Sequence, residues 1–342
     1  MRGPSLPAGK LPAADLARLL RTCTHRDARL VVPPGVGIDA AVIDMGDRYL
    51  VAKTDPITFA TDAVGWYAVH VNANDIAAMG ATPRFFLATV LLPAGLADLA
   101  MAETILQSIH SAASSLGILV CGGHTEITHG LNRPVVVGQM LGECTPEQLV
   151  RPAGLQPGHA LLLTKGLAVE GTAVMARERR QELVRRGYAP AFLDRAASFL
   201  TAPGISVVAD ARVATSAGHV SAMHDPTEGG VATAIAEMAQ AAGLGVEIDS
   251  DALPIAAETR QLCAEFGLDP LGTISSGALL IGCRPEDADA ILVSLAQAGI
   301  EARCIGHAMG AGAGLWLRRD GQSMPLPVFA ADEITRLFTE AE

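Results

Sequence analysis

The sequence predicts a mixed α/β protein (α+β class) of two domains, and three observations lead to that prediction. Strand-like and helix-like segments alternate along the chain, and the alternation restarts after a stretch rich in Pro and Gly at 151–158. The 342 residues exceed the size at which one core usually stops growing, which is ~250–300 residues. Half of the residues are hydrophobic but only 4% are aromatic, so Ala, Val, Leu and Ile must form most of the core.

The first predicted domain is 1–152. Apolar residues recur at helical spacing in three segments, and the last of the second segment, Gly80, is a natural helix stop. Turn-like residues separate the first two apolar strand segments. Helices are expected at 15–23, 64–80 and 99–116, and strands at 40–44, 48–53, 85–92, 118–121 and 134–142.

The second predicted domain is 153–342. It repeats the mixture of elements, although no convincing sequence repeat relates the two halves. Strands are expected at 160–164, 219–223, 246–249, 277–283, 302–307 and 315–317, and helices within 170–215 and at 230–242, 256–266 and 286–298.

Charge and composition exclude several classes of protein. A net charge of −11 argues against a nucleic-acid groove, which needs clustered Lys and Arg. The most apolar stretch, 85–97, is broken by Pro93 and Gly95 and is too short to span a membrane, and residues 1–7 lack the apolar run of a signal peptide. The six cysteines form no Cys-x-x-Cys pair, which argues against zinc. We therefore expect a cytoplasmic protein that binds neither nucleic acid nor membrane.

Four aspartates lie in short, turn-like segments: Asp39, Asp55, Asp75 and Asp225. The segments around them, 37–41, 54–56, 72–80 and 224–230, contain no Lys or Arg, so no local ion pair is expected. Carboxylates held together without a cation repel each other, and Mg²⁺ removes that conflict while sharing its ligands with phosphates. The pattern predicts a Mg²⁺–nucleotide site assembled from distant segments.

Asn72 and Asp75 are three residues apart and would share one face of the predicted helix at 64–80. Polar groups on so apolar a helix need partners, which favours a role in ligand binding. The alternative is that Asn74 or Asp75 caps a shorter helix that begins at Ile76.

Asp55 and Asp225 each precede a proline, which holds them extended at the end of a strand. Strand ends are where ligands bind in open sheets, although an Asp-Pro pair can also simply start a turn. Thr227, Gly229 and Gly230 follow Asp225 and precede a helix, where a phosphate can bind. An ordinary Gly-Gly loop is the alternative.

A second predicted glycine loop is 121–126, after a strand. Gly122 and Gly123 would let a ligand approach the backbone, His124 could contact a phosphate or nucleophile, and Glu126 could orient it or reach a metal. A structural histidine is the alternative. A Walker loop is absent, because Leu11 rather than Ser or Thr follows Gly9-Lys10.

Together these segments resemble the AIR synthase-related (PurM-like) ATP-binding superfamily. Its members include aminoimidazole ribonucleotide synthase, thiamine-monophosphate kinase, selenophosphate synthetase and the hydrogenase maturation protein HypE. The resemblance covers nearly the whole chain. Its markers, in order, are Gly9-Lys10, Val36–Val42, Thr54-Asp55, Asn74–Ala81, Gly122–Thr125 and Asp225–Gly230.

This resemblance implies an N-terminal domain that forms a β-barrel with a second subunit, so a homodimer, and a C-terminal α/β domain. It implies ATP and Mg²⁺ as cofactors, with Asp39, Asp55, Asp75 and Asp225 as metal ligands and Lys10 near the phosphates. With Lys10, the catalytic candidates are His124 and Glu126. The remaining nucleotide-binding candidates are Asn72, Asn74, Gly122, Gly123, Thr125, Thr227, Gly229 and Gly230.

The segment 225–230 is most similar to the HypE branch, which implies ATP-dependent phosphorylation of an amide or carbamoyl-type oxygen and a possible protein partner. HypE carries its carbamoyl group on a C-terminal cysteine, whereas the last cysteine here is Cys304. Ile38 also stands where an acid is common, and His124 where the kinase branch has aspartate. The alternatives are a small-molecule kinase or ligase of the thiamine-monophosphate kinase or AIR synthase type, and a nucleotide-binding partner protein without turnover.

Overall fold

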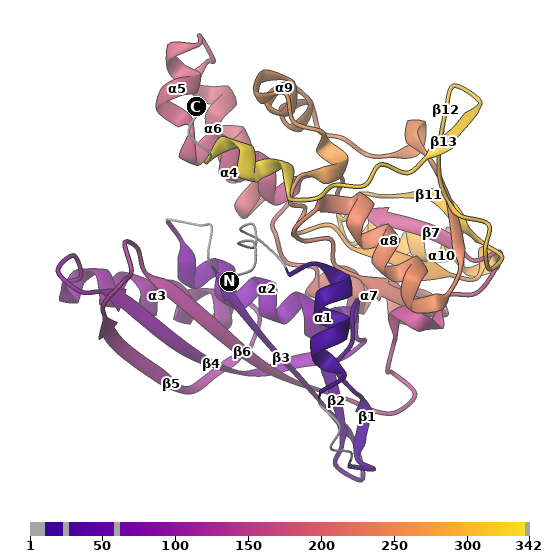
Figure 1. The fold of residues 1–342 in the computed structure, drawn as a ribbon, viewed down its shortest axis with the longest axis horizontal. Helices are drawn as coiled ribbons and strands as arrows, with labels where there is room; N and C mark the ends of the chain where they lie inside the picture. Colours follow the sequence, from indigo (N-terminus) through magenta and orange to yellow (C-terminus); the bar gives the residue numbers. More distant parts are fainter. Residues whose placement is uncertain (1–10, 23–26, 58–61, 339–342) are drawn as a thin grey trace, which may run out of the picture. The chain divides into compact units, whose positions relative to one another are not determined.

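The computed structural model describes residues 11–22, 27–57 and 62–338, which fold as two compact units (Figure 1). The smaller unit is Asp39–Leu149 with the short segment that ends at Pro33. The larger unit contains α1 (Ala13–Leu20), Pro34–Ile38 and the chain from Val150 onward. Each unit has its own sheet, and the predicted mixture of helices and strands is confirmed.

The smaller unit is a sheet with two helices. Its strand order is β1-β2-β3-β6-β4-β5, and every neighbouring pair is antiparallel except the parallel pair β4 and β5. Helix α2 packs on β3 and β6, and α3 packs on α2. The elements are β1 (Leu30–Val32), β2 (Ala41–Asp44), β3 (Tyr49–Ile57), α2 (Val64–Ala78), β4 (Thr82–Pro93), α3 (Leu99–Ser115), β5 (Leu119–Thr128) and β6 (Val135–Cys144).

Helix α2 is buried on almost every side, which explains why its residues are small or apolar all round rather than on one stripe. Its contact with α3 is close: a Cβ at Gly65 would lie 2.6 Å from the carbonyl oxygen of Ile105. The helix runs without a break through Asn74 and Asp75. The alternative of a shorter helix capped at these residues is therefore wrong.

Two strands extend beyond their predicted ends. Strand β3 continues through Asp55 and Pro56, so Asp55 lies within the strand rather than after it. The proline is tolerated because β2 pairs only with Tyr49–Ala52, which leaves that edge of β3 open at Pro56.

Strand β5 contains the whole of 121–126, so the predicted glycine loop there is wrong. The sequence signal was nevertheless real, because a Cβ at Gly123 would lie 2.1 Å from the carbonyl oxygen of Ala88. The backbone that approaches this glycine belongs to the neighbouring strand β4.

The larger unit has a sheet in the order β13-β12-β9-β11-β7-β10-β8. All neighbouring pairs are antiparallel except β12 and β9, which are parallel. The strands are β7 (Ala160–Thr164), β8 (Val220–His224), β9 (Gly245–Asp249), β10 (Leu280–Cys283), β11 (Ala302–Met309), β12 (Leu315–Arg319) and β13 (Gln322–Pro325).

Two cores stabilise the larger unit. Helix α8 (Gly230–Ala242) packs on β8, β9 and β10, and its Ile235 and Met238 belong to the same core as Leu161 and Leu163 of β7. Helix α10 (Pro285–Gln297) packs on β7, β11 and α7 (Val208–Ala217). The second core lies among α4 (Val169–Glu178), α5 (Arg180–Arg185), α6 (Pro190–Ala197), α9 (Ala257–Phe266) and the 3₁₀ turn η5 (Glu333–Leu337).

None of the helices in the described residues is both long and apolar enough to cross a membrane.

Candidate functional site

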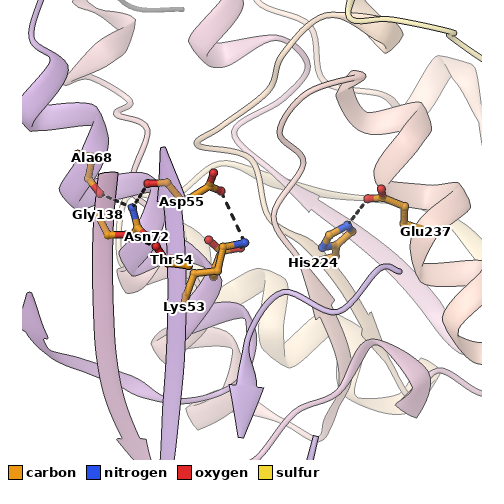
Figure 2. Close-up of polar contacts among 9 residues, drawn as sticks. Lys53, Thr54, Asp55, Ala68, Asn72, Gly138, His224 and Glu237 are labelled. Atoms are coloured by element: carbon orange, nitrogen blue, oxygen red, sulfur yellow. Dashed lines mark hydrogen bonds and ion pairs between the residues drawn. The ribbon is translucent and has the colours of Figure 1, made fainter. Parts of the chain in front are cut away.

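Three of the four predicted aspartates lie in the smaller unit, where they surround a lysine. Lys53 Nζ is 3.6 Å from Asp55 Oδ2 (Figure 2) and 3.0 Å from Asp75 Oδ1, and the charge of Asp39 also acts on Lys53. The expectation that these carboxylates have no cation nearby is therefore wrong. The spacing of Lys53 and Asp55 could have indicated this ion pair, because residues two apart on a strand share a face, as these two do on β3.

The electrostatics of this cluster favour a positive charge. Burial raises the pKa of Asp75 to about 7, and Lys53 lowers this pKa while Asp39 and Asp55 raise it. Burial alone would lower the pKa of Lys53, but Asp75, Asp55 and Asp39 raise it above its usual value. Lys53 is thus charged at neutral pH, and it balances one of three carboxylates.

The cluster also fits a second, harder cation. Asp75 Oδ2 is buried and has no hydrogen-bond partner among the described residues. A buried carboxylate oxygen without a donor is costly unless a proton or a metal ion satisfies it. Oxygen ligands of this kind are those that Mg²⁺ prefers.

Asn72 ties α2 to β3. Its Nδ2 donates to the backbone oxygens of Ala68, at 2.8 Å, and Asp55, at 3.3 Å (Figure 2). A Cβ at Gly138 would lie 2.3 Å from this nitrogen, so the glycine makes room for the amide. The contacts of Asn72 thus hold the backbone at Asp55 in place from the buried side of β3. Asn74, also on α2, is fully buried.

The candidates on β5 lie apart from the aspartates of the same unit. His124 and Glu126 are exposed, with 3.4 Å between Nε2 and Oε2, and Gly122, Gly123 and Thr125 lie on the same strand. Strands β4 and β6 separate β5 from β3. Three strand spacings of ~4.8 Å correspond to roughly 14 Å. The single chain therefore does not bring His124 to Asp55.

In the larger unit, Asp225 directly follows the last residue of β8, as its Asp-Pro context predicted, and it is almost completely buried. The preceding residue, His224, is 2.8 Å from Glu237 of α8, measured from Nε2 to Oε2 (Figure 2). Glu237 was not predicted, because only the packing of α8 shows that it faces His224.

The two glycines at the start of α8 have different roles. Gly230 has a φ of +67°, and a Cβ there would lie 2.3 Å from the carbonyl oxygen of Leu271. The N–H of Gly229 donates to Asp332 Oδ2 at 2.6 Å, and that of Gly230 donates to the Thr227 carbonyl at 3.0 Å. A carboxylate of the protein itself thus lies at the helix N-terminus where the sequence predicted a phosphate.

Asp332 is one of two buried acids here that sequence reasoning missed. Its Oδ1 also accepts from the N–H groups of Ile274, at 3.2 Å, and Ile334, at 2.8 Å. Burial raises the pKa of Asp332 to about 6, although these backbone bonds lower it. No local sequence motif indicates that Asp332 is buried and hydrogen-bonded, because two of its three N–H donors, Gly229 and Ile274, are distant in the sequence.

The other missed acid is Glu170, in the first turn of α4. Burial raises the pKa of Glu170 to about 7, a hydrogen bond with Ser276 lowers it, and the negative charges of Asp332 and Glu228 raise it.

The predicted catalytic residue Lys10 lies outside the residues that the structure describes.

The comparisons with known proteins agree with this architecture. The N-terminal domain model of AIR synthase related proteins matches 37–144, and the C-terminal domain model matches 156–315. The carbamoyl dehydratase HypE of Rhizobium leguminosarum bv. viciae is 32% identical over 267 residues, covering 76% of this chain and 71% of that protein. The chain belongs to the AIR synthase related family.

Within that family, the chain lies in the HypE branch, an enzyme branch that includes the carbamoyl dehydratases. Among solved structures, a chain of the HypE–HypF complex matches with a TM-score of 0.75 and 20% identity, covering 92% of this chain and 99% of that one. A HypE structure in complex with ATP matches with a TM-score of 0.72 and 22% identity, covering 96% and 97%. These two likenesses confirm the fold.

Proposed function

We propose that this protein is a HypE-like enzyme that uses Mg²⁺–ATP to phosphorylate the oxygen of an amide or carbamoyl-type group. The observation that carries the proposal is the 32% identity to a carbamoyl dehydratase over 76% of the chain. Both domain models match, so the likeness extends through both units. A solved HypE with bound ATP supports the nucleotide.

The smaller unit supports the metal. Asp39, Asp55 and Asp75 would hold Mg²⁺, with Asp75 Oδ2 as the buried oxygen that lacks another partner among the residues described. Bound there, the metal would neutralise phosphate charge. Lys53 would hold Asp75 and Asp55 in place through its two ion pairs. Asp225, the fourth predicted ligand, belongs to the larger unit.

The proposed reaction has two stages. The amide oxygen attacks the γ-phosphorus and ADP leaves, which gives an O-phosphorylated imidate after one N–H proton is lost. The C–O bond then breaks, the oxygen leaves as inorganic phosphate, and loss of the second N–H proton gives a nitrile. Phosphorylation is needed because it converts the amide oxygen into a good leaving group, while positioning and charge neutralisation lower the barrier.

Binding of Mg²⁺–ATP to the full chain is the first test. We expect calorimetry to detect binding, and Asp75→Asn to weaken it at least ~10-fold, because losing one charged ligand removes at least ~1.4 kcal/mol. The matched control is Asp47→Asn, since Asp47 is exposed and pairs only with Arg48 among the described residues. No binding by the unsubstituted protein would overturn the proposal.

Turnover separates the enzyme from its alternatives. The probe is a peptide whose C-terminal cysteine carries an S-carbamoyl group, with ADP release and the peptide mass as readouts. A peptide that loses the mass of water supports the dehydratase. A phosphorylated small molecule formed instead would indicate the kinase class, and ATP binding without turnover of any amide probe would indicate a nucleotide-binding partner protein.

We also propose that a second copy of the chain pairs through the smaller unit. Strand β5 is an edge strand, and it exposes Leu119 and Ile127, which are 59% and 65% accessible. Apolar edge strands are usually covered, and barrel closure is one way to cover them. Sedimentation equilibrium should give the mass of a dimer, and a monomer at micromolar concentration would contradict it.

A further inference from the structure

The ammonium group of Lys53 bridges two carboxylates of the smaller unit. Lys53 and Asp55 are two residues apart on β3 and therefore share a face of the strand, and α2, which packs on β3, contributes Asp75. The Nζ atom of Lys53 lies 3.0 Å from Asp75 Oδ1 and 3.6 Å from Asp55 Oδ2. A divalent cation that is shared by two carboxylates joins them in the same way.

The backbone places these carboxylates together independently of Lys53. Asn72 Nδ2 donates to the backbone oxygen of Asp55 at 3.3 Å, and Thr54 Oγ1 donates to the Gly138 carbonyl on β6 at 2.9 Å. Asp75 lies in the last turn of α2, where the helix dipole disfavours a negative charge. The fold therefore holds the acids in positions that require a cation.

A structural ion pair accounts for only part of this arrangement. One carboxylate would balance Lys53, but the charges of Asp39, Asp55 and Asp75 all act on it. The side chain of Asp75 is 6% exposed, and its Oδ2 has no hydrogen-bond partner in the described part of the chain. An orphan oxygen of this kind is costly unless a proton or a cation satisfies it. The three negative charges would be balanced by the ammonium and one divalent ion.

Resting on the proposed function, in which these aspartates hold Mg²⁺, we propose that Lys53 takes the place of one divalent cation, so that the aspartate cluster of the smaller unit binds a single Mg²⁺ rather than two. Groups of carboxylates can hold two metal ions that share them. Here the ammonium occupies the bridge between Asp55 and Asp75 and repels a second ion. As part of the chain, it remains in place at any Mg²⁺ concentration.

The first test counts the ions bound to the full chain without nucleotide, with Mn²⁺ as the probe and the electron paramagnetic resonance signal of free Mn²⁺ as the readout. Lys53→Ala removes the charge and opens the space that Nζ fills, so it should bind one more Mn²⁺ per chain than wild type. Lys53→Arg keeps the charge and is the matched control, which should bind the same number as wild type. An equal count for Lys53→Ala and wild type would overturn the inference.

A second measurement keeps the test decisive if Lys53→Ala unfolds without metal. An ion that binds only the folded state stabilises it. Mg²⁺ should therefore restore the circular dichroism spectrum of Lys53→Ala and raise its unfolding temperature more than that of wild type or Lys53→Arg, whereas Na⁺ at equal ionic strength should not. Adding Asp75→Asn to Lys53→Ala should abolish this response. A Lys53→Ala protein that stays unfolded at every Mg²⁺ concentration, or gains no more than wild type, contradicts the proposal.

The two proposals fail in different ways. If wild type binds no ATP, or binds it and leaves the S-carbamoyl peptide unchanged, the proposed function is wrong, and the Mn²⁺ count still decides whether Lys53 replaces a cation. If wild type converts the peptide but Lys53→Ala takes up no additional ion, the function stands and the inference about Lys53 is wrong.

Discussion

Each unit contains a group of buried or half-buried acids, and the two groups are stabilised differently. In the smaller unit, Asp55 and Asp75 lie within 3.6 and 3.0 Å of Lys53 Nζ. In the larger unit, Asp332 accepts three backbone N–H groups and Glu170 bonds to Ser276. Among the residues described, the charges that act on these two acids, those of Asp332 and Glu228, are negative.

The difference shows two ways to accommodate buried carboxylates. In the smaller unit a counter-charge opposes the effect of burial: Lys53 lowers the pKa of Asp75, which is still raised to about 7. In the larger unit, backbone N–H groups lower the pKa of Asp332 and a hydrogen bond with Ser276 lowers that of Glu170, while burial raises these pKa values to about 6 and about 7. Loss of the cation should therefore affect only the first arrangement, whereas both arrangements should respond to pH.

The largest expected effect follows from removing the positive charge of Lys53 in the smaller unit. Lys53→Met keeps the length of the side chain but removes its charge, and it should lower the free energy of unfolding by about 3 kcal/mol. The cause is that Asp75 and Asp55 lose the cation that balances them. Chemical denaturation at pH 7 measures this change.

The control for that substitution is Arg48→Ala. Arg48 and its partner Asp47 are 51% and 73% exposed, so water screens their interaction. The loss should be below about 1 kcal/mol. Equal effects at the two positions would show that burial of the Lys53 cluster contributes nothing.

A smaller effect concerns the larger unit and depends on pH. Burial raises the pKa of folded Glu170 from about 4.5 to about 7. A raised folded-state pKa stabilises the fold fully below the unfolded value, and this contribution is lost as pH rises through the folded value. Between pH 4 and 8, the loss from this one group is at most about 3 kcal/mol.

Glu170→Gln removes this titration. Denaturation series at pH 4 and pH 8 should show that wild type loses more stability than the variant over this interval. The difference isolates Glu170, because the other acids titrate in both proteins. Identical losses in the two proteins would mean that Glu170 keeps an ordinary pKa, and the two acid groups would then not differ as described.

Local patterns were sufficient where the local signal and the packing agree. Strand β7 and helix α8 have the predicted bounds, because their apolar spacing matches the cores they enter. The aspartates and glycine motifs, read in order, also identified the family. Each of these features is a property of neighbouring residues in the chain.

Local patterns misled where tertiary pairing overrides turn-forming residues. Pro56 and Gly123 indicated a strand end and a loop, yet both lie inside strands. Strand pairing with β6 holds the first, and the close approach of β4 holds the second. The hydrogen bonds of a sheet come from segments that a local window does not contain.

The sequence by itself determined the family, the mixed architecture and which acids are candidates for metal binding. Only the tertiary structure decided which charges meet. Lys53 and Asp75 are 22 residues apart, and Gly229 and Asp332 are 103 apart. Because the pKa of a carboxyl depends on burial and on charges a few ångströms away, these folded contacts set the pKa values of Asp75, Asp332 and Glu170.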